Sequence, residues 1–159
     1  MPSIQPIHRP QGATRHVGLL GDRYIFRLTS EDTDGAFALV EAIVGPGHGT
    51  PPHVHTREDE TFVILEGRIE FTVGDRTLTL AIGDTLFAPR EVAHHFRNPT
   101  ERPARMLSLI TPGGFEAFLE RAGTRLAGPD DAPPPPGDQD IARVMALADD
   151  YGVKILSPG

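Results

Sequence analysis

Short runs of alternating apolar and polar residues, separated by turn residues, fill the chain from about residue 15 to residue 110. In one such run Ile69, Phe71 and Val73 fall on one side, and the residues between them are polar or charged. This period of two is typical of a β-strand that is buried on one face. Glycine beside an acidic residue separates several of the runs, as expected of tight turns. The predicted strands are His16–Leu20, Tyr24–Thr29, Phe37–Val44, Thr61–Leu65, Arg68–Val73, Thr77–Ile82, Thr85–Ala88, Val92–Arg97 and Ala104–Ile110.

Many short strands joined by short turns predict an all-β domain, either an antiparallel sandwich or a barrel. The alternation also predicts which side chains enter the core. In the strand Thr77–Ile82 we expect Leu78, Leu80 and Ile82 to be buried.

The pattern changes from a period of two to helical spacing after residue 111. Helical spacing predicts a helix that buries Phe115, Phe118, Leu119 and Ala122. Residues 129–137 form a proline-rich connector, which is stiff and extended. A second helix is expected from a capping Asp138 to Asp150, with Ile141, Val144, Met145 and Ala148 on one face. We therefore expect a β-domain at residues 1–112 and a helical appendage at residues 113–159 that packs outside it.

Composition and charge exclude several functional classes. A length of 159 residues argues for one domain, and a formal net charge of -7 argues against partners that are nucleic acids or anionic membranes. The sequence has no apolar run of about 18 residues that could span a bilayer. The proline-punctuated N-terminus does not resemble a secretory signal, so we expect a cytoplasmic protein.

The chain contains no cysteine, which excludes disulfides, thiolate nucleophiles, iron–sulfur clusters and cysteine-ligated zinc. Any metal must therefore bind nitrogen and oxygen ligands. His53 and His55 are two residues apart, so on a strand they face the same side. Glu60 follows after a polar stretch that can turn the chain into the adjacent strand, and a later strand supplies His94. Three imidazoles and a carboxylate suit one divalent first-row ion, namely Fe, Mn, Ni, Cu or Zn.

These residues also match two sequence motifs, and the chain resembles the cupin superfamily over residues 36–110. Gly47, His53, His55, Glu60 and Gly67 fill the first motif, and Gly83, Pro89, His94 and Asn98 fill the second. Glu91 occupies a position where the family has glycine. The resemblance implies a jelly-roll β-barrel, one metal ion and small single-domain bacterial relatives of the quercetin-dioxygenase-like type. It selects His94 as the ligand, and alternation points the neighbouring His95 the opposite way.

The resemblance further implies that Glu60 is either a ligand alone or both a ligand and a catalytic base, as in cupins that cleave flavonols. Phe62 and Ile64 share the strand face of Glu60, so we expect them to line a substrate pocket. Phe71 and Phe96 either line the same pocket or belong to the core. His48 lies either at the pocket mouth or in a solvated loop. His8 and His16 are expected at the surface or at strand ends.

Three functional classes fit these residues and motifs. The first is a mononuclear dioxygenase that uses O2 on a small enol, phenol, flavonoid or polyketide-like substrate. The second is a non-redox metal enzyme, namely an isomerase, decarboxylase or lyase. The third is a non-catalytic module that binds a small molecule. Small cupins frequently pair through sheet edges, so the resemblance also implies a homodimer.

Overall fold

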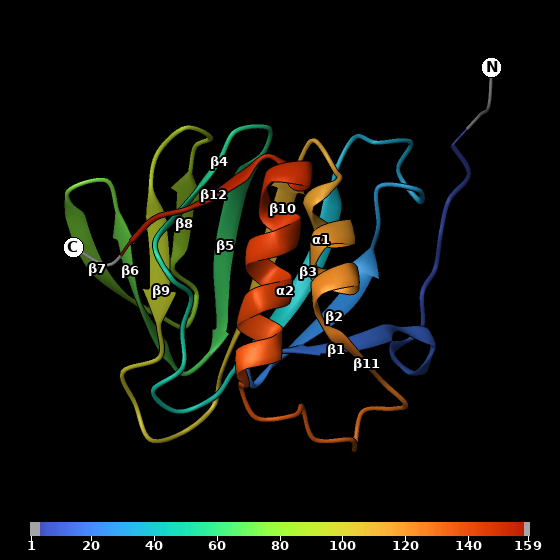
Figure 1. Ribbon diagram of the computed structural model, residues 1–159. Coiled ribbons are helices and arrows are strands. Elements are labelled where there is room, and N and C mark those ends of the chain that lie inside the picture. Colours follow the sequence, from blue (N-terminus) through green and yellow to red (C-terminus); the bar gives the residue numbers. More distant parts are fainter. Residues whose placement is uncertain (1–3, 158–159) are drawn as a thin grey trace.

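The computed structural model describes residues 4–157, and two antiparallel sheets face each other in it (Figure 1). The outer ends of the expected β-domain and helical appendage, residues 1–3 and 158–159, lie outside the described residues. The seven-stranded sheet has the order β11-β1-β2-β3-β10-β5-β8, and the five-stranded sheet has the order β12-β4-β9-β6-β7. The all-β prediction is confirmed. The two sheets form a jelly-roll sandwich, and they are not hydrogen-bonded into one closed barrel within the described residues.

The strands of the seven-stranded sheet are β1 Arg15–Leu19, β2 Asp22–Leu28, β3 Ala38–Val44, β5 Asp59–Glu66, β8 Thr85–Ala88, β10 Ala104–Thr111 and β11 Thr124–Leu126. Those of the five-stranded sheet are β4 His53–His55, β6 Arg68–Val73, β7 Arg76–Ala81, β9 His94–Arg97 and β12 Val153–Ile155. The helices are α1 Phe115–Ala122 and α2 Asp138–Ala148, with short 3-10 turns at Gln11–Ala13 and Asp149–Tyr151. None of the helices within residues 4–157 combines the length and the apolar character that a bilayer crossing requires.

The inner face of the seven-stranded sheet is covered in two parts. At one end of β3 and β10, Ala42, Val44 and Met106 pack beneath the five-stranded sheet. At the other end, inward-facing residues pack with the apolar faces of α1 and α2. The helices thus lie over the part of the sheet that the second sheet leaves open (Figure 1). A single chain therefore builds two adjoining cores, and the boundary between them is where a cavity forms.

The C-terminal segment joins both sheets as well as covering them. β11 pairs with β1 at one edge of the seven-stranded sheet, and β12 pairs with β4 at an edge of the five-stranded sheet. Each of these two strands has three residues, which is too short for alternation to reveal, so the sequence predicted neither. In the structure, the segment expected to lie outside the β-domain extends both sheets.

Helix α2 begins and packs differently from the prediction. Val144 and Ala148 are buried, whereas Ile141 and Met145 are 52% and 54% exposed, so their predicted burial is wrong. The face that includes Val144, Leu147 and Ala148 meets the core instead. The cap is Gly137, whose N–H donates to the Asp140 carboxylate at 3.1 Å, and Asp138 is the first helical residue.

Burial of Ile82 is a second incorrect prediction. Leu80 is buried and Leu78 packs against the core, but β7 ends at Ala81, and Ile82 is 68% exposed. Alternation stops applying where the strand gives way to the turn at Gly83.

The expected homodimer stays a prediction.

The observed face of α2 predicts different effects for two neighbouring positions. Val144→Asp should lower the free energy of unfolding by roughly 3 kcal/mol, because it buries a charge without a partner. Met145→Asp should change it by less than about 0.5 kcal/mol, because that side chain is exposed. Urea unfolding followed by circular dichroism measures both. Equal losses in the two variants would show that the helix is rotated from the described position.

Candidate metal centre

The structure brings together the four side chains that the sequence singled out as ligands. His53 and His55 lie on β4, His94 lies on β9, and Glu60 lies on β5. One donor atom from each residue lies within 4.8 Å of the others, and all four side chains are buried. The three histidines therefore come from the five-stranded sheet, and the carboxylate comes from the opposite sheet.

This placement corrects the expected route of the chain between His55 and Glu60. The polar residues after His55 do not turn the chain into an adjacent strand of the same sheet. They carry it across the sandwich to β5, which pairs with β10 and β8. Glu60 consequently faces the histidines across the interior, so the ligand set links the two sheets.

The carboxylate of Glu60 lies at the centre of the cluster. His94 Nε2 is hydrogen-bonded to Glu60 Oε2 at 2.8 Å. His55 Nε2 lies 3.2 Å from the same oxygen, yet this buried nitrogen makes no hydrogen bond. His53 and His94 are directly paired across β4 and β9, with ring centroids 4.5 Å apart. Three convergent imidazoles around one carboxylate are a donor set for a transition-metal ion.

Backbone oxygens orient two of the histidines. His53 Nδ1 lies 2.8 Å from the carbonyl oxygen of Pro51, to which it can donate a hydrogen bond. His94 Nδ1 lies 3.3 Å from the carbonyl oxygen of Val92. When Nδ1 carries the hydrogen, Nε2 has a lone pair that can bind a metal, and for His94 this form replaces the hydrogen bond from Nε2 to Glu60.

The electrostatics of the cluster favour a bound cation. Burial and the neighbouring His94 and His55 lower the pKa of His53 to about 3, so this ring stays neutral. Burial opposes ionisation of Glu60, but His55 and His94 hold its pKa well below the usual range. Burial also opposes protonation of His55, yet Glu60 and Glu58 outweigh it and raise the pKa to about 9. A buried carboxylate that attracts positive charge, together with the unpartnered Nε2 of His55, fits a metal ion.

A largely apolar cavity adjoins the cluster. His53, Glu60 and His94 form part of its wall. The apolar lining includes Phe62, Phe96, Met106 and Ile110 from the strands and Phe115, Phe118, Leu119 and Val144 from the helices. Polar groups enter the wall through Tyr24, Thr50 and Ser108. Burial, with Asp22 and Glu60 nearby, raises the pKa of Tyr24, so its hydroxyl stays protonated.

Two of the five predicted pocket residues line this cavity, and three do not. Phe62 and Phe96 form part of the wall. Phe71 lies behind them, with its ring centroid 4.8 Å from that of Phe62 and 5.7 Å from that of Phe96. Ile64 is on the inward-facing side of β5, but it lies in the buried core with Phe71 and does not line the cavity. Phe71 therefore follows the core alternative, and Ile64 is a core residue as well.

The predicted pocket role of His48 is also corrected. Its Nδ1 lies 2.8 Å from Asp22 Oδ1, which accepts a hydrogen bond from the backbone N–H of Gly45. Asp22 is buried, so its carboxylate requires polar partners, and His48 supplies one. His48 therefore ties its loop to β2.

His95 and His16 lie on strands, outside the cluster. His95 is half-buried on the face of β9 opposite to His94. His16 lies near the start of β1, which is one of the two positions expected for it, and it is buried. Its ring nitrogens lie 2.8 Å from an Arg23 guanidinium nitrogen and 3.0 Å from the Thr14 hydroxyl.

Sequence reasoning missed the contribution of the C-terminal helices and of Ser108. Ser108 Oγ donates to Glu60 Oε1 at 3.4 Å. A signal for it existed, because Ser108 is the polar member of an inward-facing series in β10 that is otherwise apolar. No comparable signal existed for Phe115, whose ring packs edge-on against His55 with centroids 4.4 Å apart.

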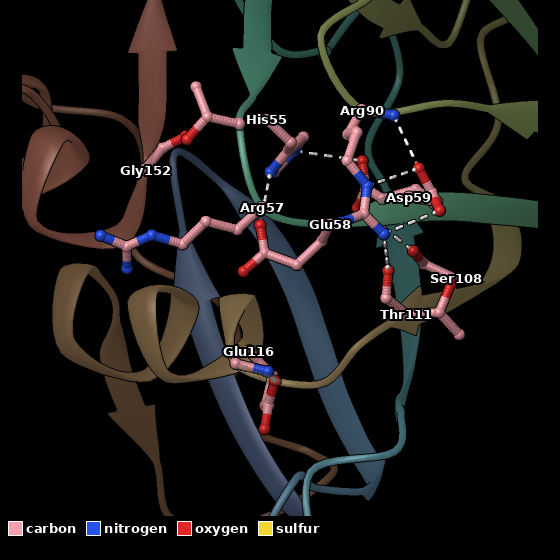
Figure 2. Close-up of polar contacts among 12 residues, drawn as sticks. His55, Arg57, Glu58, Asp59, Arg90, Ser108, Thr111, Glu116 and Gly152 are labelled. Carbon is pink, nitrogen blue, oxygen red and sulfur yellow. Dashed lines mark hydrogen bonds and ion pairs between the residues drawn. The ribbon is translucent and has the colours of Figure 1, made fainter.

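The turn before His94 places Glu91, at the position where the family motif has glycine, in a left-handed conformation. Glu91 has a φ of 65°, in the left-handed region that glycine occupies without strain. Its N–H donates to the carbonyl oxygen of His55 at 2.8 Å. Next to it, Arg90 forms a two-pronged ion pair with Asp59 at the start of β5 (Figure 2). These contacts hold the loop between β8 and β9 against the two ligand strands.

The second motif ends in a residue that closes the loop after His94. Asn98 is fully buried, and its Nδ2 donates to the carbonyl oxygens of Val44 and Arg102. Its Oδ1 accepts the backbone N–H of Thr100 at 3.0 Å. Asn98 therefore stabilises the backbone of the loop after His94.

Comparisons with known proteins agree with this geometry. Residues 40–110 match the family model described as a Cupin domain. The chain is 30% identical over 98 residues to quercetin 2,3-dioxygenase of Bacillus subtilis, which covers 62% of this chain and 29% of that protein. It is 28% identical over 138 residues to the tetracenomycin polyketide synthase protein TcmJ of Streptomyces glaucescens, covering 86% and 87%. The chain spans about half or less of the length of the first curated relatives it matches.

Among solved structures, an RmlC-like cupin from Shewanella frigidimarina superposes with a TM-score of 0.59 at 18% identity. The match covers 72% of this chain and 99% of that one. An identity this low shows a shared fold.

The ligand geometry predicts a contrast between two adjacent histidines. Wild-type protein should hold close to one first-row metal ion per chain after reconstitution, and His94→Ala should lose it, because that substitution removes a donor atom. His95→Ala should retain the metal, because its ring faces away from the cluster. Metal analysis after gel filtration measures occupancy. Loss of metal from His95→Ala alone would show that the register of β9 is wrong.

The left-handed conformation of Glu91 predicts a stabilising substitution. Glu91→Gly should raise the free energy of unfolding by up to about 1 kcal/mol, because glycine removes the strain of a positive φ. Glu31→Gly is the control, since Glu31 is an exposed turn residue without positive φ, and it should lose about 0.5 kcal/mol. Urea unfolding separates the two. A loss of stability in both variants would contradict strain at residue 91.

Proposed function

Because residues 40–110 are a domain of the cupin superfamily, we propose that this protein is a mononuclear metal-dependent dioxygenase that acts on a small, electron-rich enol or phenol. The observation that carries the proposal is the joining of two features in one site. A three-histidine, one-carboxylate cluster forms part of the wall of a cavity whose other walls are mainly apolar and aromatic. Non-haem oxygenases combine such nitrogen and oxygen donors with open coordination positions.

His53, His55, Glu60 and His94 would hold the metal, and the donor set fits a divalent first-row ion. When bound, the ion supplies Lewis acidity and redox chemistry. The protein supplies the rest. The aromatic walls bind and orient a flat apolar substrate and exclude water, and α1 and α2 close the cavity over it.

Glu60 is placed to handle the substrate proton. An enol or phenol that enters the cavity brings its O–H toward Glu60, and the carboxylate can accept the proton at an Oε atom. The Ser108 hydroxyl holds Oε1, which leaves Oε2 on the side of His55 and His94. The low pKa of Glu60 keeps the carboxylate ionised before substrate arrives.

The polarity of the cavity narrows the substrate class. Its lining residues include no lysine and no arginine, so a substrate bearing a carboxylate or phosphate would meet no cation of the described chain in this wall. A neutral aromatic or polyketide-like compound fits better. The names of two relatives, a quercetin 2,3-dioxygenase and a polyketide synthase protein, support the same class.

Oxygen consumption tests the proposal. Protein loaded in turn with Fe, Mn, Ni or Cu should consume O2 in proportion to substrate when offered a panel of flavonols, catechols and diketones. Glu60→Gln should slow turnover about 100-fold, because it removes the base and weakens the metal site. His95→Ala should leave turnover unchanged.

Two outcomes would contradict the oxygenase. Conversion of a substrate without O2 consumption would assign the protein to non-redox metal chemistry. Binding of the same compounds without any conversion, at full metal occupancy, would make it a binding module.

A further inference from the structure

We propose that Glu58 is a positioning residue that controls the metal through His55. The inference rests on the proposed metal site and adds a fifth residue that does not touch the metal. Glu58 lies in the segment that crosses between the sheets, directly between the ligand strand β4 and the ligand strand β5. Its side chain is buried, with 4% exposure, although nothing in the proposed chemistry uses it.

Two unpartnered atoms face each other at this position. His55 Nδ1 and Glu58 Oε2 are both buried and have no hydrogen-bond partner. They lie 3.7 Å apart, and Figure 2 shows the two side chains directed toward each other. Metal coordination at Nε2 leaves the hydrogen of His55 on Nδ1, so the ring then has one donor, and Glu58 Oε2 is in front of it. A movement of less than about 1 Å makes the hydrogen bond.

The other two histidine ligands are oriented in a different way. His53 and His94 have backbone carbonyl oxygens near Nδ1. His55 has a carboxylate in that place. A charged acceptor pulls on the N–H more strongly than a neutral one, and it makes the opposite ring nitrogen a better donor to a metal. His55 is therefore the ligand whose strength the protein can set through a side chain.

The charges of the site support the same assignment. Glu58 and Glu60 together carry two negative charges next to three imidazoles that are neutral when they bind metal, so a divalent ion balances them. Among residues 4–157, the ion pairs include no lysine or arginine bound to Glu58. The neighbouring Arg57 donates to the backbone oxygen of Asp150, and Arg90 is paired with Asp59 (Figure 2). Arg90 interacts with Glu58 only at longer range, so the one ion-pair partner of Glu58 within the described residues is His55.

Helix α1 closes over this pair. A Cβ at Gly114 would lie 3.6 Å from Glu58 Oε1, and the ring of Phe115 packs against His55. Glu58 therefore lies beneath the start of α1, where the partial positive charge of the helix favours a carboxylate. Because water is excluded there, the pull of Glu58 on His55 is screened little.

Metal affinity and a spectroscopic signature test the proposal in the full-length protein. Glu58→Gln keeps the shape and an acceptor oxygen but removes the charge, and Glu58→Ala removes both. Competition with a chelator should show Cu(II) affinity weakened about 10- to 100-fold in Glu58→Gln and at least as much in Glu58→Ala. The copper hyperfine coupling in electron paramagnetic resonance should change, because the donor strength of His55 changes.

Glu116→Gln is the matched control. Glu116 is another buried carboxylate at the start of α1, and it accepts the backbone N–H groups of Ser30 and Gly114 without touching a ligand. The Glu116→Gln variant should match the wild type in Cu(II) affinity and in its spectrum, even if its stability differs. Thermal unfolding of the metal-free variants separates loss of folding from loss of affinity, and the isosteric Glu58→Gln carries the test if Glu58→Ala does not fold.

The outcomes distinguish this role from the metal site itself. If wild type binds one Cu(II) and Glu58→Gln has the same affinity and spectrum, the role of Glu58 is overturned while the metal site stands. If affinity falls equally in Glu58→Gln and Glu116→Gln, the effect is general to this region and the proposal is overturned. If wild type binds no metal, the proposed function fails and the role of Glu58 fails with it.

Discussion

A buried carboxylate that faces three imidazoles across the sandwich is the interaction on which the site depends. Glu60 comes from the seven-stranded sheet and His53, His55 and His94 from the five-stranded sheet, so the cluster forms only if the two sheets stack in one alignment. Without a cation these groups satisfy one another incompletely, as the unpartnered Nε2 of His55 shows. A metal ion would satisfy them together and join the sheets.

The loops beside the cluster are braced by contacts that carry no chemistry themselves. Arg90 ties the loop between β8 and β9 to Asp59, one residue before Glu60. The N–H of Glu91 reaches the backbone of His55, and Asn98 fastens the segment after β9 to β3. Ligand positions must be held to a fraction of an ångström for a metal site to work. The contacts of Arg90, Glu91 and Asn98 supply that restraint.

The C-terminal helices enclose the space beside the cluster. They cover the part of the inner sheet face that the second sheet leaves open, and they complete an apolar wall with Phe115, Phe118 and Leu119. In the proposed function, this apolar enclosure would retain a neutral, flat molecule beside the four side chains and keep water away from it.

The all-β architecture, most of the strands and the identity of the four clustered side chains could be predicted from the sequence, because a period of two and motif spacing are local properties of the chain. The sequence did not determine that Glu60 reaches the cluster from the opposite sheet, that His48 bonds to Asp22, or that α2 buries Val144 and exposes Met145. Nor did it reveal the strands β11 and β12, which have three residues each. Those features depend on how segments distant in the sequence pack together, because that packing sets which faces meet and which buried polar atoms find partners.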